Sequence, residues 1–337
     1  MPNVPEIRII IVAYDSMSFL GECLLAIAAQ TYKNFEVVIV DNGGTKTGGG
    51  YHRIDLPDAR FRRIKASTNA GYSGGMVRGS DGAQSKWLMS VNPDTIIAMN
   101  CLEKLMNAAE LHEDPSMLSP CLFSDPQHKI IDGFGDSVSI TGLVWRNSHG
   151  KVGEHKNFKQ AIVEVFSPSG AAALYLRSAY EEACGINTDF FCYMEDVDLG
   201  LRLRAYGGTC LLVREATGVH TGGHSTKKIA GFATKYASRN SLLMIVSSAP
   251  LPIIMPLLFI HILSRFTLQW RTRGTESARF RAMGTREAIP LLWPFFKKRF
   301  ARPSYPFGAS FRVLKRLDWS LTGHRHMRLN SWDISNT

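Results

Sequence analysis

The sequence Ile7-Arg8-Ile9-Ile10-Ile11-Val12-Ala13 is a near-continuous apolar run that only Arg8 interrupts. Such a run, followed by Tyr14-Asp15, is typical of a strand that is buried on both faces of a parallel sheet. A second apolar run, Val37 to Val40, ends in Asp41, and Leu20 to Gln30 has helical periodicity between the two. This order predicts a β-α-β opening and hence an α/β fold.

The rest of the first 240 residues continues this alternation. Further strands are expected at 61–66, 87–91, 171–176 and 211–213, and further helices at 102–111 and 197–206. Residues 120–165 have no clear period, so we expect loops and short strands there. Gly48-Gly49-Gly50 is expected to form a flexible loop.

Polar residues recur where the expected strands end: Tyr14-Asp15, Asp41-Asn42, Asn69 and Asp94. Asp, Asn and Gly are also the usual turn formers, so each position alone has an ordinary explanation. In open α/β sheets, however, ligands bind beyond the carboxyl ends of the strands. Together the four strand ends predict one nucleotide-binding crevice.

The composition is that of a globular protein. With 337 residues, 45% hydrophobic and 20% charged, the chain can form one large α/β domain with an appendage. Its six cysteines include no Cys-x-x-Cys pair, which argues against a zinc site and a disulfide framework and favours a reducing, cytosolic compartment. No secretory signal precedes the first expected strand.

An acidic cluster follows an aromatic run at residues 190–198. Glu195, Asp196 and Asp198 open the helix expected at 197–206. The helix dipole alone favours acids in a first turn, but an acid held against aromatic side chains is also suited to act as a general base. Glu195 and Asp198 are three residues apart and share a helical face, while Asp196 points about 100° away from Glu195. This spacing does not decide which of the three is the base.

The C-terminal segment carries the basic character of the chain. The net charge is +10, and 15 Lys/Arg but only three acidic residues lie between Arg265 and Arg328. Residues 240–264 contain no charged side chain and are long enough to span a bilayer, but Pro250, Pro252 and Pro256 are expected to break or kink a helix there.

Aromatic residues beside cations indicate how this segment is used. Trp270 and Trp293, with Lys297-Lys298-Arg299, fit helices that lie in the plane of an anionic membrane. We therefore predict a catalytic domain at 1–239 and a membrane-associating helical segment at 240–337. A spanning or re-entrant segment, a soluble lid and a dimer interface remain alternatives.

Nucleic-acid binding is the rival function that the basic pI of about 9.4 raises. Here the basic groups alternate with long apolar runs, and the strand ends carry acids that would repel phosphates without a metal. We therefore expect no nucleic-acid partner. A sugar-nucleotide-binding protein without activity is a further alternative.

The joint order of the motifs resembles the family 2 glycosyltransferases over about residues 5–240. The motifs are Ile11 to Asp15, Gln30-Thr31-Tyr32, Val40 to Gly43, Asn69 to Gly75, Asn92-Pro93-Asp94-Thr95, Ser169-Gly170-Ala171, Phe191 to Leu199 and His220. The resemblance implies a GT-A fold and inversion at the transferred sugar. Asn92 to Thr95 and Glu195 to Leu199 look most like the rhamnosyltransferase-type branch that builds bacterial surface polysaccharides.

The resemblance also implies roles for residues. Asp94 and His220 would hold Mg²⁺ or Mn²⁺, and Asp196 would be the general base, with Glu195 and Asp198 as alternatives. The residues expected to contact the nucleotide-sugar are Ala13, Tyr14, Asp15, Asp41, Asn42, Asn69, Gly71, Gly74, Gly75, Arg78, Asn92 and His224. The glycines among them would form a loop that approaches the donor closely.

Two departures from the family pattern bear on the donor. Asp15 stands where the family usually has Asn, and Gly74-Gly75 is followed by Met76-Val77 where the family has two Asn. The expected donor is dTDP-L-rhamnose, with a UDP-sugar (galactofuranose or a hexose) as the alternative. The expected acceptor is a lipid-linked saccharide or polysaccharide at the inner leaflet of the bacterial inner membrane, on its cytoplasmic side, and the chain could form a homodimer.

Overall fold

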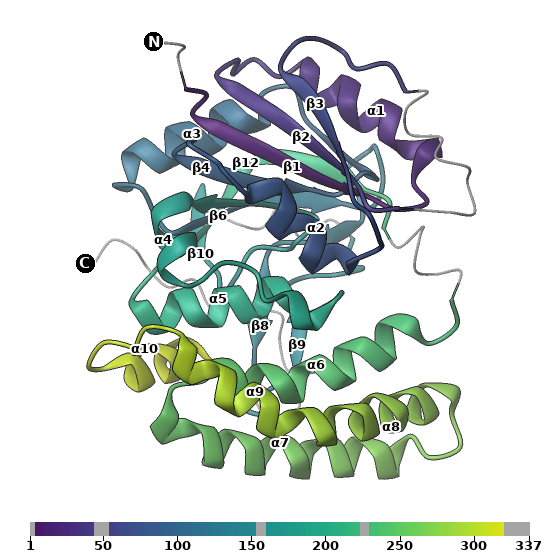
Figure 1. Ribbon diagram of the computed structural model, residues 1–337, viewed down its shortest axis with the longest axis vertical. Coiled ribbons are helices and arrows are strands. Elements are labelled where there is room, and N and C mark those ends of the chain that lie inside the picture. Colours follow the sequence, from purple (N-terminus) through teal and green to yellow (C-terminus); the bar gives the residue numbers. More distant parts are fainter. Residues whose placement is uncertain (1–3, 44–53, 153–159, 223–228, 320–337) are drawn as a thin grey trace.

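The computed structural model describes residues 4–43, 54–152, 160–222 and 229–319. Within these ranges a ten-stranded mixed sheet has the order β10-β12-β6-β11-β4-β1-β2-β3, with β5 beside β12 and β7 beside β6 (Figure 1). The strands are β1 Ile7–Ala13, β2 Phe35–Asp41, β3 Phe61–Lys65, β4 Trp87–Val91, β5 Thr95–Ile97, β6 Met117–Phe123, β7 Ile131–Gly133, β10 Ile162–Glu164, β11 Ala172–Leu176 and β12 Cys210–His220. A separate hairpin consists of β8 Asp136–Val138 and β9 Val144–Arg146.

The first strands are parallel, which confirms the expected β-α-β opening. Strand β1 lies between β2 and β4, and Ile7 is in register with Phe35 on one side and Trp87 on the other. Strand β11 is antiparallel to both of its neighbours, β4 and β6. The carboxyl ends of β1, β2 and β4 therefore share one edge of the sheet, where polar residues follow them.

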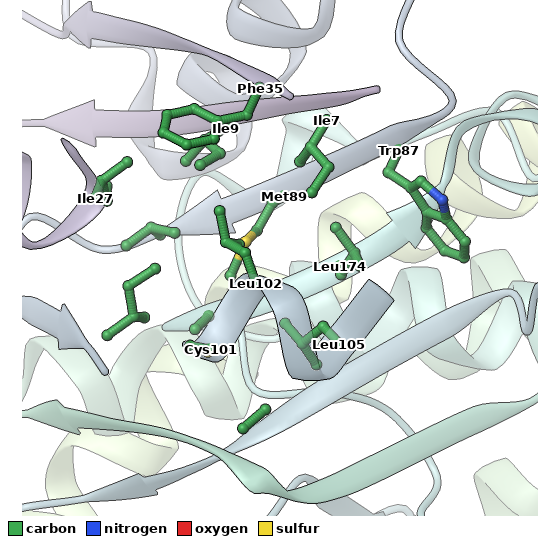
Figure 2. Packing of buried hydrophobic residues seen from close by; sticks show 14 of the residues in the cluster. Ile7, Ile9, Ile27, Phe35, Trp87, Met89, Cys101, Leu102, Leu105 and Leu174 are labelled. Carbon is green, nitrogen blue, oxygen red and sulfur yellow. The ribbon is translucent and has the colours of Figure 1, made fainter. Parts of the chain in front are cut away.

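Helices cover both faces of this sheet. Ile9 and Ile11 point into a core with α1 (Met17–Ala28) and α3 (Cys101–Leu111), whereas Ile10 and Val12 point into the core on the side of α2 (Gly71–Ser80), α4 (Arg177–Glu182) and α5 (Glu195–Tyr206). Figure 2 shows the first of these cores, in which Trp87, Met89 and Leu102 are buried. Burial on both faces explains why β1 is apolar at successive positions rather than at alternate ones.

Helix α2 replaces the glycine loop that was expected after Asn69. Gly71, Gly74 and Gly75 lie in its first two turns. A Cβ atom at Gly75 would lie 2.4 Å from the Val12 side chain, so the missing side chain lets the helix pack closely against β1. The expected loop is therefore wrong, because packing against the sheet outweighs the poor helix propensity of glycine.

Residues 120–165 contain more regular structure than their pattern indicated. Strand β6 is buried along its whole length, so it has no alternation to detect. The other strands of this region, β7 to β10, have three residues each, which is too short for a period to emerge.

A helical segment packs against α5 below the sheet (Figure 1). It contains α6 Phe232–Ser248, α7 Leu251–Arg271, α8 Glu276–Ala288, α9 Leu292–Lys298 and α10 Ala309–Arg316. Val197 and Leu201 of α5 share one hydrophobic core with Leu243, Phe295 and Val313 of this segment. The predicted domain boundary between residues 239 and 240 falls inside α6.

The prolines were expected to break or kink a helix here, and the expected break does not occur in α7. The helix runs unbroken over 21 residues. Pro250 is its N-cap and Pro252 lies in its first turn, where an amide has no acceptor within the helix. Pro256 lies inside the helix without ending it. By length and composition alone α7 could cross a membrane, and most of it is exposed.

Candidate active site

A cavity of about 480 Å³ opens at the carboxyl edge of the sheet. Its walls come from the ends of β1, β4 and β12, the start of α2, the segment before α5, and α6. The predicted residues that line it are Tyr14, Asn42, Asn69, Gly71, Asn92, Asp94, Glu195, Asp196 and His220. The structure thus brings the expected metal ligands and the expected acids to one cavity.

Several other predicted donor residues do not line this cavity or are not described. Ala13, Asp15, Asp41, Gly74, Gly75 and Arg78 are not among the residues that line it. Arg78 lies in the last turn of α2, at the far end from the cavity. His224 lies outside the described residues.

Asn42 and Asn69 hold the start of α2 against the end of β2. The Asn42 side chain donates to Asn69 Oδ1 (3.0 Å) and to the Gly71 carbonyl (2.8 Å), and it accepts from the Ala70 amide (3.2 Å). Asn69 Oδ1 also accepts from the Gly71 amide (2.9 Å). These two side chains therefore shape the cavity wall in addition to lining it.

His220 lies between two carboxylates. Its Nδ1 donates to Asp132 Oδ2 (2.8 Å), and its Nε2 lies 3.4 Å from Asp94 Oδ1. Burial alone would lower the pKa of His220, but the hydrogen bonds to Asp132 and Asp94 outweigh it and raise the pKa to about 8. Asp132 was not among the predicted site residues; it belongs to β7, which reaches the site by pairing with β6.

Asp94 and His220 fit a divalent cation. Two ligands that are each about 2.1 Å from one ion lie roughly 3 Å apart, close to the distance seen here. A histidine that donates its other ring N–H to a carboxylate, as His220 does to Asp132, is the usual arrangement of a metal ligand. The described ranges contain no cluster of three or more acidic, His or Cys side chains suited to a metal. Further ligands would have to come from elsewhere, such as the donor phosphates.

The three clustered acids have different environments. Asp198 is fully buried, forms an ion pair with Arg202 (2.8 Å) and accepts from Ser248 Oγ (2.5 Å), so its role is structural. Asp196 lines the cavity, and its carboxylate accepts from the amides of Gly170 (2.8 Å) and Val197 (2.9 Å).

Glu195 and Asp196 differ in how readily they ionise. Burial raises the pKa of Glu195 well above its usual range, and the charge of Asp196 raises it further. Burial also raises the pKa of Asp196, but the amide hydrogen bonds from Gly170 and Val197 oppose this shift. Asp196 is therefore the carboxylate that ionises first and stays oriented, as a general base must.

The segment before α5 has a strained backbone. Phe191, Tyr193 and Met194 have φ angles of 65°, 67° and 72°, and non-glycine residues in this region cost on the order of 1–3 kcal/mol each. Gly71 makes room for the segment, since a Cβ there would lie 2.2 Å from the Phe191 carbonyl oxygen. The aromatic ring of Phe191 stacks on Tyr236 of α6, with centroids 5.6 Å apart.

Arg146 lines the cavity and was also missed by sequence reasoning. It ends β9 and forms an ion pair with Asp132 (3.0 Å). Burial raises the pKa of Asp196, and the charge of Arg146, which favours the ionised form, opposes this rise. A cation at this position also suits an anionic ligand such as a diphosphate.

Comparison with known proteins identifies the family of this chain. The family model for glycosyl transferase family 2 matches residues 8–183, which is more than half of the chain. An N-acetylglucosaminyl-diphospho-decaprenol L-rhamnosyltransferase of Mycobacterium tuberculosis is 26% identical over 238 residues, covering 65% of this chain and 76% of that protein.

Solved structures show the same fold. TarS of S. aureus (residues 1–349) aligns with a TM-score of 0.53 at 13% identity, over 92% of this chain and 88% of that one. A mannosyltransferase from Pyrobaculum calidifontis, in complex with GDP-Man and Mn²⁺, aligns with a TM-score of 0.53 at 15% identity, over 93% and 87% of the two chains. The chain therefore belongs to glycosyl transferase family 2, has the GT-A fold and is similar to the rhamnosyltransferase-like branch of that family.

Proposed function

We propose that this chain is an inverting, metal-dependent glycosyltransferase that moves L-rhamnose from dTDP-L-rhamnose to a lipid-linked or polysaccharide acceptor. The observation that carries the proposal is that Asp94, His220 and Asp196 line one cavity. The rhamnosyltransferase relative and its diphospho-decaprenol acceptor, as its name gives it, support the choice of donor and acceptor. A UDP-sugar is the alternative donor.

Two groups of cavity residues would share the reaction. Asp94 and His220 would hold Mg²⁺ or Mn²⁺, which neutralises the charge that develops on the leaving nucleoside diphosphate. Asp196 would accept the proton of the acceptor hydroxyl as that oxygen attacks the anomeric carbon from the face opposite the diphosphate. The amides of Gly170 and Val197 hold the Asp196 carboxylate in position for this transfer.

Exposed apolar side chains on α7 support attachment to a membrane. Met255, Phe259, Phe266 and Trp270 are 61–72% exposed, and their spacing of four, seven and four residues places them on one face of the helix. An apolar face of this kind on a helix that lies along the protein surface suits the boundary between head groups and acyl chains. We infer that the protein binds the cytoplasmic side of the inner membrane through this face.

The basic cluster at residues 297–299 contributes less to such binding than its sequence indicated. Lys298 forms an ion pair with Asp189. Arg299 donates to the carbonyls of Val246 (2.9 Å) and Ala249 (2.8 Å) at the end of α6. Lys297 is exposed and lies 5.7 Å above the Trp293 ring. Two of the three cations are therefore engaged within the protein, and the apolar face of α7 is the main candidate for the contact.

A donor screen tests the proposed function. Thermal shifts would be measured with dTDP-L-rhamnose, UDP-galactofuranose, UDP-hexoses and GDP-mannose, each with Mn²⁺ and with EDTA. The proposal predicts the largest shift with dTDP-L-rhamnose and a smaller shift when EDTA removes the metal. Stabilisation by GDP-mannose alone would refute the donor assignment, and equal shifts in EDTA would refute the metal dependence.

A further inference from the structure

We propose that Asn240 is a positioning residue that holds the catalytic segment 190–194 in its strained conformation, so that the C-terminal helical segment completes the active site. The inference rests on the proposed glycosyl transfer, because it assigns the catalytic base to Asp196.

One buried side chain bonds three carbonyls of the segment. Asn240 lies in α6 and is fully buried. Its Nδ2 lies within hydrogen-bond distance of the carbonyl oxygens of Phe190 (3.1 Å), Cys192 (3.0 Å) and Tyr193 (2.7 Å), which share its two hydrogens. The remaining carbonyl, that of Phe191, accepts from the Ser73 amide of α2 (3.1 Å). Four successive carbonyls are therefore held, three by α6 and one by α2.

The orientation of the Asn240 side chain is itself fixed. Its Oδ1 accepts from Arg239 (2.8 Å), whose guanidinium also donates to the Asp189 carbonyl (3.3 Å). With Oδ1 occupied in this way, the amide nitrogen must face the segment. The two neighbouring residues of α6 thus bind both the start and the middle of residues 189–193.

The segment needs external support because its backbone is strained. Phe191, Tyr193 and Met194 all have positive φ angles, and such conformations persist only where the surrounding structure determines them. Without Asn240, the carbonyls of Phe190, Cys192 and Tyr193 would each lose a donor, although that of Phe190 would keep the Cys192 amide (2.8 Å). A buried carbonyl that loses a donor is costly, and the segment could relax only by moving.

Movement of residues 190–194 would displace Asp196 directly. Met194 is the N-cap of α5, and Glu195 and Asp196 are the next two residues. Asp196 is oriented by a 2.8 Å hydrogen bond from the Gly170 amide, which belongs to a different part of the chain. A shift at the start of α5 would therefore change the distance from Asp196 to an acceptor hydroxyl. Asp94, which lies between β4 and β5, and His220, which ends β12, would stay in place.

The test uses Asn240→Asp in the full-length protein. This change keeps the shape but places a carboxylate against the three carbonyls. Asn240→Ser, which keeps one donor, is the second variant and carries the test if Asn240→Asp does not fold. Ser241→Ala is the matched control, because Ser241 is a buried neighbour in α6 whose hydrogen bonds go to Ser238, His261 and Arg265.

Three measurements decide the outcome. We expect kcat to fall by roughly 100-fold in Asn240→Asp, the size of effect that a misplacement of about 1 Å produces, while Mn²⁺-dependent affinity for dTDP changes by less than about 3-fold. Amide hydrogen exchange at 190–197, measured without substrate, should become faster. Ser241→Ala should change neither kcat nor this exchange.

Unchanged kcat with unchanged exchange would overturn the inference. A loss of kcat without faster exchange, or a parallel loss of dTDP affinity, would overturn it as well, since the residue would then act elsewhere. If the wild-type protein transfers no sugar from any donor, the proposed function fails, and hydrogen exchange still decides whether Asn240 holds the segment.

Discussion

Replacing Asp132 by asparagine should weaken metal-dependent donor binding and leave the fold intact. The Asp132 carboxylate accepts from His220 Nδ1 at 2.8 Å, which directs Nε2 toward Asp94. Loss of such a carboxylate partner typically lowers metal affinity by about 10- to 100-fold. This corresponds to roughly 1.4–2.7 kcal/mol, at 1.36 kcal/mol per factor of ten.

The assay is titration calorimetry of dTDP in Mn²⁺ and in EDTA, because the difference isolates the contribution of the metal. The pKa of His220 is about 8 and is raised, so the imidazole loses its extra proton as the pH rises through that value. Titrations near pH 8.5 therefore keep competition between proton and metal small. The asparagine variant removes a charge that raises the pKa of His220. A measurement at lower pH would therefore mix the lost orientation of His220 with a change in its protonation.

His149→Gln is the control for this experiment. His149 Nδ1 lies 2.6 Å from the main-chain oxygen of Asp132, and its side chain is 60% exposed. The control should keep the metal-dependent affinity of the wild type. If Asp132→Asn also keeps it, His220 does not bind the metal through the geometry described.

Three further predictions concern the base, the membrane and the catalytic segment. Asp196→Asn should lower kcat by about 10²- to 10⁴-fold. Glu195→Gln should stay active with an unshifted acid limb in the pH–rate profile, because the more strongly raised pKa of Glu195 keeps it protonated where Asp196 titrates. Reversed effects would assign the base to Glu195. Phe259→Ser and Phe266→Ser should each remove roughly 1.5–3 kcal/mol of apolar burial and release the protein from vesicles in sedimentation assays, and unchanged binding would exclude the α7 face. Gly71→Ala should lower the melting temperature and kcat together, since its Cβ would meet the Phe191 carbonyl; wild-type values for both would show that the segment moves freely.

Much of the sheet could be predicted from the sequence because its strands are buried on both faces. The run from Ile7 to Ala13 contains seven buried residues in succession, and burial of that kind leaves a continuous apolar signal. Helix α2 could not be predicted in this way. Its glycines resemble a loop locally, and only the close contact of Gly75 with Val12 explains why they are helical.

The sequence predicted the site residues that follow long strands. It did not predict those that are placed by the pairing of short strands with distant parts of the chain. Asp94 and His220 follow β4 and end β12, so the expected edge of the sheet brings them together. Asp132, which holds His220, and Arg146, which lines the cavity, lie on short strands without a detectable period.

The roles of the three acids and of the C-terminal cations also depended on contacts that lie far apart in the sequence. Asp198 accepts a hydrogen bond from Ser248, which is 50 residues away in the sequence. Lys298 forms an ion pair with Asp189, which is 109 residues away in the sequence. Asp198 also has a local partner, Arg202, but Ser248 and Asp189 are not part of any local pattern. The spacing of the acids alone therefore left the base undecided, and the basic cluster was assigned to the membrane.

Sugar transfer itself tests the central claim most directly. The purified protein would be incubated with dTDP-L-rhamnose, Mn²⁺ and a polyprenyl-diphosphate-linked N-acetylglucosamine, and the lipid product analysed by mass spectrometry beside the Asp196→Asn variant. The account predicts the addition of one deoxyhexose by the wild-type protein and almost none by the variant. Equal transfer by the two proteins, or no transfer by the wild type from any thymidine- or uridine-diphosphate sugar, would contradict it.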